Sequence, residues 1–252
     1  MRLPTRHLVE VMGTVVTIDF FGSNSATERD ESLCEAERVL READRTFSTW
    51  IADSPVSRLR RGEISLAQAP SDVADVLGEC RRLKEISRGW FDPWALPGGV
   101  DPTGLVKGWA AQRALHALDR VEATGIIVNA GGDIALRGAD DEGNAFRVGI
   151  TNPVDELNVI AVAEVTSAIA TSGESQRGAH LFDSKSGVYR SALASATVVG
   201  PDLAVADALA TALVVGGDEM MEVIHHLDGY FALSVDRDGD LRATPGFPLV
   251  SE

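Results

Sequence analysis

Strand-like and helix-like segments do not alternate regularly along this 252-residue chain. A β-branched and aromatic segment at 9–21 comes first, and amphipathic segments with helical spacing follow at 28–47, 71–87 and 105–118. Strand-like segments then dominate up to residue 199. Because a doubly wound parallel sheet needs regular alternation, this order favours an α+β fold with mixed or antiparallel sheets and packed helices.

Turn-rich segments separate these elements. The first strand is interrupted at Met12-Gly13-Thr14, where we expect a bulge or a close backbone approach. Residues 47–63 mix Ser, Asp and Pro and predict an irregular loop. Residues 89–108 hold five Gly, three Pro and two Trp, a composition that favours a functional site over a linker.

Later segments predict a mostly β second half. Residues 125–137 are typical of two strands joined by the Asn129–Asp133 turn, which we interpret as structural. A closing hairpin is expected near Arg237-Asp238-Gly239. The strands expected besides these lie at 146–150, 159–165 and 194–199.

The charge balance excludes some classes of partner. With 23 basic and 38 acidic residues the net charge is −15, which argues against nucleic acid and anionic membrane surfaces. This net charge would repel a phosphate-rich ligand, so binding one would need a metal ion, a helix N-terminus or a few suitably positioned cationic side chains. No signal-peptide or membrane-spanning pattern is present, and Cys34 and Cys80 have no metal-ligand spacing, so we expect a cytoplasmic protein.

The apolar segment 204–217, AVADALATALVVGG, carries Asp207 and Thr211 four residues apart. On a helix these side chains share one face, and an unpaired carboxylate among Ala, Val and Leu needs a partner. Mg²⁺ accepts such oxygen ligands together with substrate phosphates. The alternative is a polar pair that faces water at the edge of the helix. Lys107, expected in the first turn of its helix, opposes the helix dipole unless a phosphate binds nearby.

Several short motifs occur in a specific order along the chain. Together they resemble the ApbE family of FAD:protein FMN transferases, over residues 12–217. The motifs are MGT at 12–14, FSTWxxDSxxSRL at 47–59, FDP at 91–93, Asp101-x5-Lys107-Gly108, NAGGDI at 129–134, TSG at 171–173, His180 before Asp183-x3-Gly187, and AxADALATAL at 204–213.

The resemblance implies a fold and an activity. It implies one domain over residues 1–252 with a T-fold-related, two-lobed architecture and an FAD cleft between the lobes. The implied enzyme uses FAD and Mg²⁺, attaches FMN to a Ser or Thr of an acceptor flavoprotein, and releases AMP. The alternative is an FAD-binding protein or FAD pyrophosphatase that transfers nothing to an acceptor.

The resemblance also assigns residues. The implied metal ligands are Asp207, Thr211 and the backbone carbonyl of Gly104. The implied FAD contacts are Met12, Trp50, Trp90, Phe91, Asp92, Asp101, Lys107 and Leu181.

Phosphoryl transfer mainly needs positive charge held at the bridging oxygens and a nucleophile in line with the leaving group. Lys107 is therefore expected to assist the metal in supplying that charge. His180 or a nearby carboxylate is expected to accept the proton of the incoming hydroxyl. The alternative for His180 is a turn histidine bonded to the backbone, and the alternative for Lys107 is a surface lysine. For Trp50 the alternative is an aromatic residue at the rim of the site.

Three features depart from the family pattern. Only eight residues separate Asp92 from Asp101, where the family usually has several dozen. Gln112 stands near the place of a family aspartate, and Phe182-Asp183-Ser184 replaces the usual Ile-Asp-Pro. A more open cofactor cleft is expected from the shortened segment.

Overall fold

The computed structural model describes residues 4–22, 26–155, 157–173 and 181–250. Its centre is an eight-stranded sheet in the order β1-β2-β3-β4-β7-β10-β11-β12, in which all neighbours are antiparallel. The hairpins β5–β6 and β8–β9 stand apart from it.

The strands are β1 Thr5–Val11, β2 Thr14–Phe21, β3 Gly125–Ala130, β4 Asp133–Gly138, β5 Phe146–Thr151, β6 Val159–Val165, β7 Ala168–Gly173, β8 Phe182–Asp183, β9 Val188–Tyr189, β10 Ser195–Gly200, β11 Phe231–Val235 and β12 Leu241–Ala243. The helices are α1 Ala26–Phe47, α2 Pro55–Arg60, α3 Ser71–Ile86, α4 Thr103–Ala117, α5 Leu203–Gly216 and α6 Asp218–His225, with a 3₁₀ turn at Leu66–Gln68.

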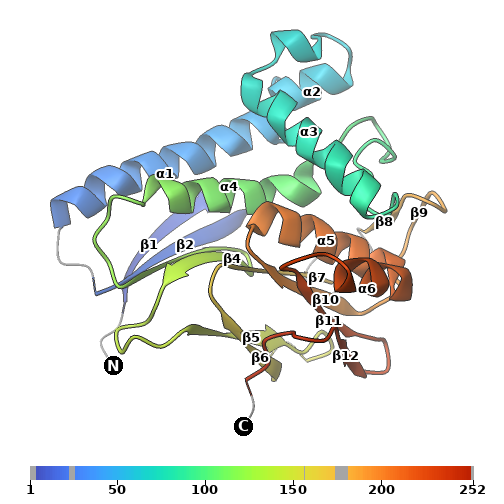
Figure 1. Cartoon of the computed structure of the whole chain (residues 1–252). Coiled ribbons are helices and arrows are strands. Elements are labelled where there is room, and N and C mark those ends of the chain that lie inside the picture. The colour runs from blue at the N-terminus through green and yellow to red at the C-terminus, as the bar shows by residue number, and fades with distance from the viewer. Residues whose placement is uncertain (1–3, 23–25, 156, 174–180, 251–252) are drawn as a thin grey trace.

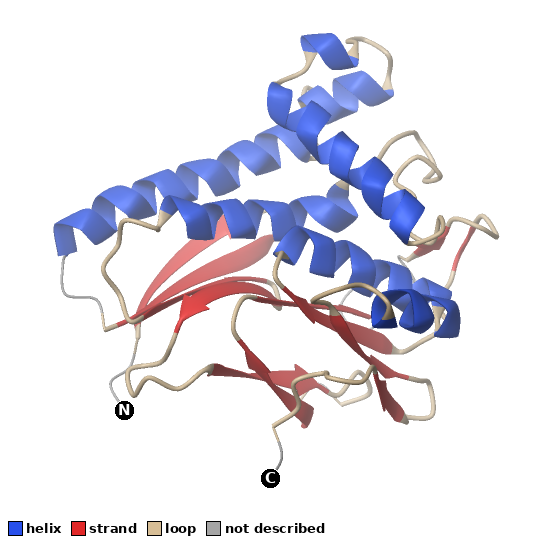
Figure 2. Ribbon diagram, in the orientation of Figure 1, coloured by secondary structure: helices blue, strands red, loops and turns tan. Residues whose placement is uncertain are grey.

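The helices cover one face of the large sheet, and the β5–β6 hairpin lies against the other face (Figures 1 and 2). Alternation along the strands explains the two layers, since successive side chains point to opposite faces. In β7, Ala168 and Ala170 join the core under the helices, whereas Ile169 joins the second core. Small residues in β7 therefore let α5 approach the sheet closely.

The second core is smaller and is closed by the end of the chain. It contains Phe146 and Ile150 of β5 and Val165 of β6. The C-terminal segment runs along β6, where the Glu164 N–H donates to the Pro248 carbonyl at 2.8 Å. This second core lies on the face of the sheet opposite the helices, so the candidate site lies on the helical face.

The α+β prediction is confirmed, and helices 28–47 and 71–87 are confirmed as α1 and α3. Their apolar residues at helical spacing, such as Leu40 and Leu83, are fully buried. The third helix starts at Thr103, so Lys107 lies in its second turn rather than its first. The division into two lobes with a cleft stays a prediction.

Two local predictions are wrong. Residues 9–21 form two strands of a hairpin, because Met12 and Gly13 adopt positive φ values of 53° and 67° and reverse the chain. Within the expected loop 47–63, residues Pro55–Arg60 form α2. Ser54 caps this helix by accepting the Ser57 N–H at 3.0 Å, and proline suits the first helical position.

No helix in the described part of the chain is both long and apolar enough to cross a membrane.

Candidate active site

Helix α5 brings a carboxylate into the core. Nearly every residue of the helix is buried, including Asp207, which is 4% exposed. Asp202 starts the helix by accepting the Val205 N–H at 3.1 Å, and Gly217 ends it. The Asp207 carboxylate therefore sits where two helices and the sheet meet, not at a water-facing edge.

Helix α4 packs directly on α5 through Gly108. A Cβ at this position would lie 2.5 Å from the Leu203 carbonyl oxygen, so only glycine allows the two backbones to approach this closely. The approach lets the Gly108 N–H donate to Asp207 Oδ2 at 3.1 Å. The glycine of the Lys-Gly motif thus connects helix packing to the buried carboxylate.

A second buried carboxylate, Asp133, faces the same place. It begins β4 directly after the Gly131-Gly132 turn and is 1% exposed. Its Oδ1 accepts the Thr171 N–H at 3.1 Å, and its Oδ2 forms an ion pair with Lys107 Nζ. The turn that we interpret as structural therefore also places a charged side chain next to Lys107.

Burial, followed by the negative charge of Asp133, raises the pKa of Asp207 to about 7, against the smaller lowering effects of Lys107 and the Gly108 N–H. Burial also raises the pKa of Asp133, against the ion pair with Lys107. With both carboxylates ionised, these two and Lys107 carry a net charge of −1. A cation placed beside them would relieve this charge.

Thr211 lies one turn after Asp207 and is half-buried. Its Oγ1 shares a 3.1 Å hydrogen bond with Ser172 Oγ of β7. A Cβ on Gly104 would lie 4.0 Å from Thr211 Oγ1, so the start of α4 reaches the same place. The structure thus brings Asp207, Thr211 and Gly104 together.

These residues fit a hard cation. Carboxylate, hydroxyl and carbonyl oxygens are the ligands that Mg²⁺ takes, and the remaining positions go to water or substrate phosphate. Within the described ranges, no three His, Cys, Asp or Glu side chains gather closely enough to hold a metal ion. A cation at this place would therefore depend on the hydroxyl, the carbonyl and the ligand.

Met12 lies at the tip of the β1–β2 hairpin, at the same end of the sheet as Asp133. The register pairs Val16 with Ala130, and Ala130 with Asp133. A Cβ on Gly131 would lie 2.9 Å from Thr14 Oγ1, so the two turns are in contact. This places Met12 beside the turn that leads into Asp133.

The three aromatic residues expected to bind FAD have different surroundings. Trp50 is 95% exposed, in a turn where Ser48 Oγ accepts its N–H. Phe91 is buried in the main core, and its ring lies against Gly104. Trp90 is half-buried, packs on Gly216 of α5 and carries the Lys185 ammonium 3.9 Å from its ring centroid.

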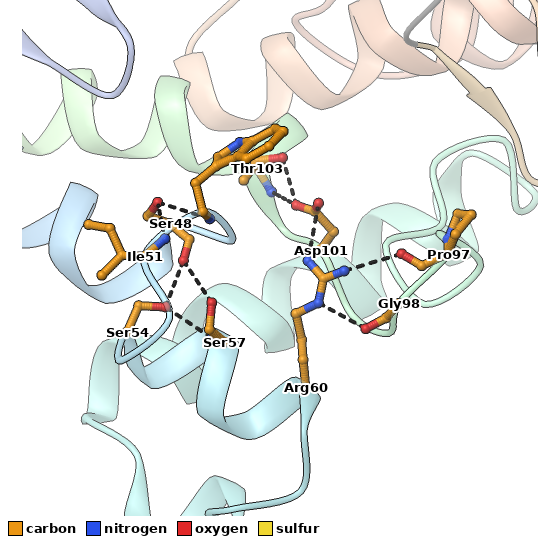
Figure 3. Close-up of polar contacts among 10 residues, drawn as sticks. Ser48, Ile51, Ser54, Ser57, Arg60, Pro97, Gly98, Asp101 and Thr103 are labelled. Carbon is orange, nitrogen blue, oxygen red and sulfur yellow. Dashed lines mark hydrogen bonds and ion pairs between the residues drawn. The ribbon is translucent and has the colours of Figure 1, made fainter.

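Asp101 is held inside the shortened loop (Figure 3). It accepts hydrogen bonds from the Thr103 hydroxyl at 2.6 Å and the Thr103 N–H at 3.0 Å. Arg60 of α2 lies 3.5 Å from the carboxylate and donates to the carbonyls of Pro97 and Gly98 at 3.2 and 3.0 Å. Sequence reasoning missed Arg60, which fastens the segment between Asp92 and Asp101.

Asp92 has partners of its own in the structure. It pairs with Lys84 of α3 at 2.8 Å and accepts the Trp94 N–H at 3.0 Å. A contact between Asp92 and FAD stays a prediction. Gln112, near the place of the family aspartate, accepts the Leu203 N–H at 3.2 Å and joins α4 to the start of α5.

His180 lies outside the described residues, and Leu181 is buried in the main core. The nearby Asp183 is the last residue of β8 and is fully buried beside the turn that follows this strand. Burial acts to raise its pKa, but hydrogen bonds from Ser186 and Arg190 outweigh this and lower it to about 2. A carboxylate with such a low pKa is a weak proton acceptor, so Asp183 stabilises the turn.

Known proteins resemble the whole chain. A protein of Haemophilus influenzae named FAD:protein FMN transferase is 25% identical, over 96% of this chain and 90% of that protein. The structure of the flavin transferase ApbE from Vibrio cholerae covers 97% of this chain and 98% of its own, with a TM-score of 0.82 and 22% identity. The structure of the ApbE protein from Thermotoga maritima covers 96% and 97%, with a TM-score of 0.82 and 20% identity.

The two structures show that the fold is shared. The sequence model of the ApbE family matches residues 12–97 and 95–233, which include both buried carboxylates and all of helices α1 to α5. This chain therefore belongs to the ApbE family.

Proposed function

We propose that this chain is a Mg²⁺-dependent FAD:protein FMN transferase. It moves the FMN half of FAD onto a Ser or Thr hydroxyl of an acceptor flavoprotein. The hydroxyl oxygen forms a bond to the FMN phosphorus, the bond from that phosphorus to the bridging oxygen breaks, and AMP leaves with the bridging oxygen. The convergence of Gly104, Lys107, Asp207 and Thr211 at the α4–α5 contact carries the proposal.

The name of the Haemophilus influenzae relative supports the same reaction. Asp207, Thr211 and the Gly104 carbonyl would hold Mg²⁺, which supplies positive charge for the diphosphate. Lys107 adds a cation from α4, and the acceptor hydroxyl loses its proton to a base. His180 is our candidate for that base, since an imidazole titrates near neutral pH.

The proposal is tested with FAD, Mg²⁺ and a panel of candidate acceptor flavoproteins, by reading the intact mass of each acceptor. We expect one acceptor to gain the mass of FMN while AMP appears in equal amount. Asp207→Ala should fold as the wild type does and lose this gain, because it removes one of the two side chains proposed to bind Mg²⁺. Full transfer by Asp207→Ala at limiting Mg²⁺ would show that the metal assignment is wrong.

His180→Asn separates transfer from hydrolysis. General base help contributes about 10²–10⁴-fold, so transfer to a protein hydroxyl should fall by that order while FAD still binds. Release of FMN and AMP without an acceptor should fall far less. Wild-type protein that releases FMN and AMP but labels none of the acceptors would favour the FAD pyrophosphatase instead.

A further inference from the structure

Asp133 is held at both of its carboxylate oxygens, at one by the sheet and at the other by helix α4. Oδ1 accepts the Thr171 N–H of the neighbouring strand at 3.1 Å, and Oδ2 pairs with Lys107. The residue is buried and follows a turn whose Asn129 Oδ1 accepts the Gly132 N–H at 2.8 Å. The direction of this carboxylate is therefore fixed by strand pairing before any ligand binds.

Two consecutive residues of α4 meet two carboxylates from different elements. Lys107 pairs with Asp133 from the sheet, and the Gly108 N–H bonds to Asp207 from α5. A lysine side chain is long and flexible, so fixing it in one direction costs rotamer entropy. An ammonium that is already held in place avoids much of that cost when an anion arrives.

We propose that Asp133 is a positioning residue that holds the Lys107 ammonium beside Asp207 and directs it at the diphosphate of FAD. The identity of the ligand rests on the function proposed above. Asp133 acts through Lys107 and does not itself contact the reacting atoms. Without the Asp133 charge, the Lys107 ammonium would lose this anchor and would no longer be fixed in one direction.

A double-mutant cycle on FAD affinity tests the coupling. FAD is titrated in saturating Mg²⁺ against the wild type, Asp133→Asn, Lys107→Met and the double variant. Loss of one charge-assisted contact should weaken binding about tenfold in each single variant. Because both changes disable the same ammonium, Lys107→Met should cost less than about threefold in the Asp133→Asn background. An equal cost of Lys107→Met in both backgrounds would overturn the proposal.

A second measurement needs no FAD. The chain has only three lysines, Lys84, Lys107 and Lys185, so amine acetylation can be followed at each by peptide mass spectrometry. Only the neutral amine reacts, and the Asp133 charge favours the charged ammonium of Lys107, so loss of that charge should raise the Lys107 labelling rate about tenfold. Lys84 and Lys185, which pair with Asp92 and Glu219, should label as before.

Asp19→Asn is the matched control. Asp19 is another buried carboxylate of the same sheet, and it pairs with Arg6 at 2.7 and 2.8 Å. This variant should leave both FAD affinity and Lys107 labelling unchanged. Asp133→Glu, which keeps the charge but moves it by one methylene, serves as a second variant if Asp133→Asn does not fold.

The two proposals fail in different ways. Unchanged Lys107 labelling in Asp133→Asn, or unchanged FAD affinity in Asp133→Glu, would overturn the positioning role. Wild-type protein that does not bind FAD would overturn the proposed function and the diphosphate assignment with it, even if the labelling confirms the ion pair.

Discussion

Buried aspartates in this protein differ in how well their charge is satisfied. Asp183 accepts hydrogen bonds from Ser186, Arg190 and two backbone N–H groups, and its pKa is lowered to about 2. Asp207 accepts a hydrogen bond from Gly108 and has a pKa raised to about 7 by burial and by Asp133. The first arrangement stabilises a folded turn, whereas the second leaves charge that a cation or ligand can meet.

We expect Asp183→Asn to destabilise the protein by up to about 2 kcal/mol at pH 7, because a pKa lowered from 3.8 to about 2 is a gain in folding free energy. The sign follows from the direction of the shift. The stabilisation is present above the unfolded pKa near 4 and is lost as the pH falls toward 2. Urea unfolding of both proteins as a function of pH measures the difference.

The difference between the two proteins should shrink below about pH 4. Asp236 forms a similar exposed turn, in which its Oδ1 accepts the Asp238 and Asp240 N–H groups at 2.9 Å. Asp236→Asn is therefore the control and should show a smaller effect. A constant offset between wild type and Asp183→Asn from pH 7 to pH 3 would contradict the assignment.

The sequence predicted those site residues whose relation is local. Asp207 and Thr211 share a helix face through their four-residue spacing, and this needs no knowledge of the fold. Asp133, Ser172 and Arg60 were missed as site residues, because their contacts join segments that are 26 to 41 residues apart in the chain. The GGD motif could have indicated Asp133 and the TSG motif could have indicated Ser172, whereas no motif indicated Arg60.

At the level of elements, periodicity predicted the long helices and most strands. It failed at the β1–β2 turn, where a non-glycine residue, Met12, takes a positive φ that its type disfavours. It also failed at α2, whose six residues are too few to show a period. The Ser54-Pro55 step is a helix-start signal that could have identified α2.

The contact between α4 and α5 predicts a large effect of Gly108→Ala. The added Cβ would lie 2.5 Å from the Leu203 carbonyl oxygen and 3.1 Å from Ala204 Cα, both backbone atoms that cannot rotate away. Forcing such a group into a packed interface typically costs about 1–3 kcal/mol. Separating the helices would also pull the Gly108 N–H from Asp207, so we expect lower thermal stability and weaker FAD binding.

Gly78→Ala is the matched control for this substitution. Gly78 lies in the middle of α3, is exposed, and has no atom within 4 Å of an added Cβ. Alanine should therefore stabilise α3 by about 0.5–1 kcal/mol without changing FAD affinity. Equal effects of the two substitutions on thermal unfolding would show that the α4–α5 approach does not depend on glycine.

At the scale of the whole molecule, the net charge of −15 opposes the anionic ligand that we propose. In the function that we propose, local charges would offset this repulsion, since Lys107 and a cation held by Asp207 would contact the diphosphate. The two effects have different ranges. Salt screens charges beyond a Debye length of about 30 Å at 0.01 M and about 10 Å at 0.1 M, and it screens contacts in a buried site much less.

We therefore expect the association rate of FAD to rise severalfold when ionic strength increases from about 0.01 to 0.1 M at saturating Mg²⁺, because salt screens the long-range repulsion. The dissociation rate should change little, because it depends on the buried contacts. Stopped-flow flavin fluorescence measures both rates. Riboflavin, which lacks the diphosphate, should show no salt dependence of association if it binds. An FAD association rate that falls with salt would mean that a local positive field steers the ligand, and the acidic surface would then play no part in its approach.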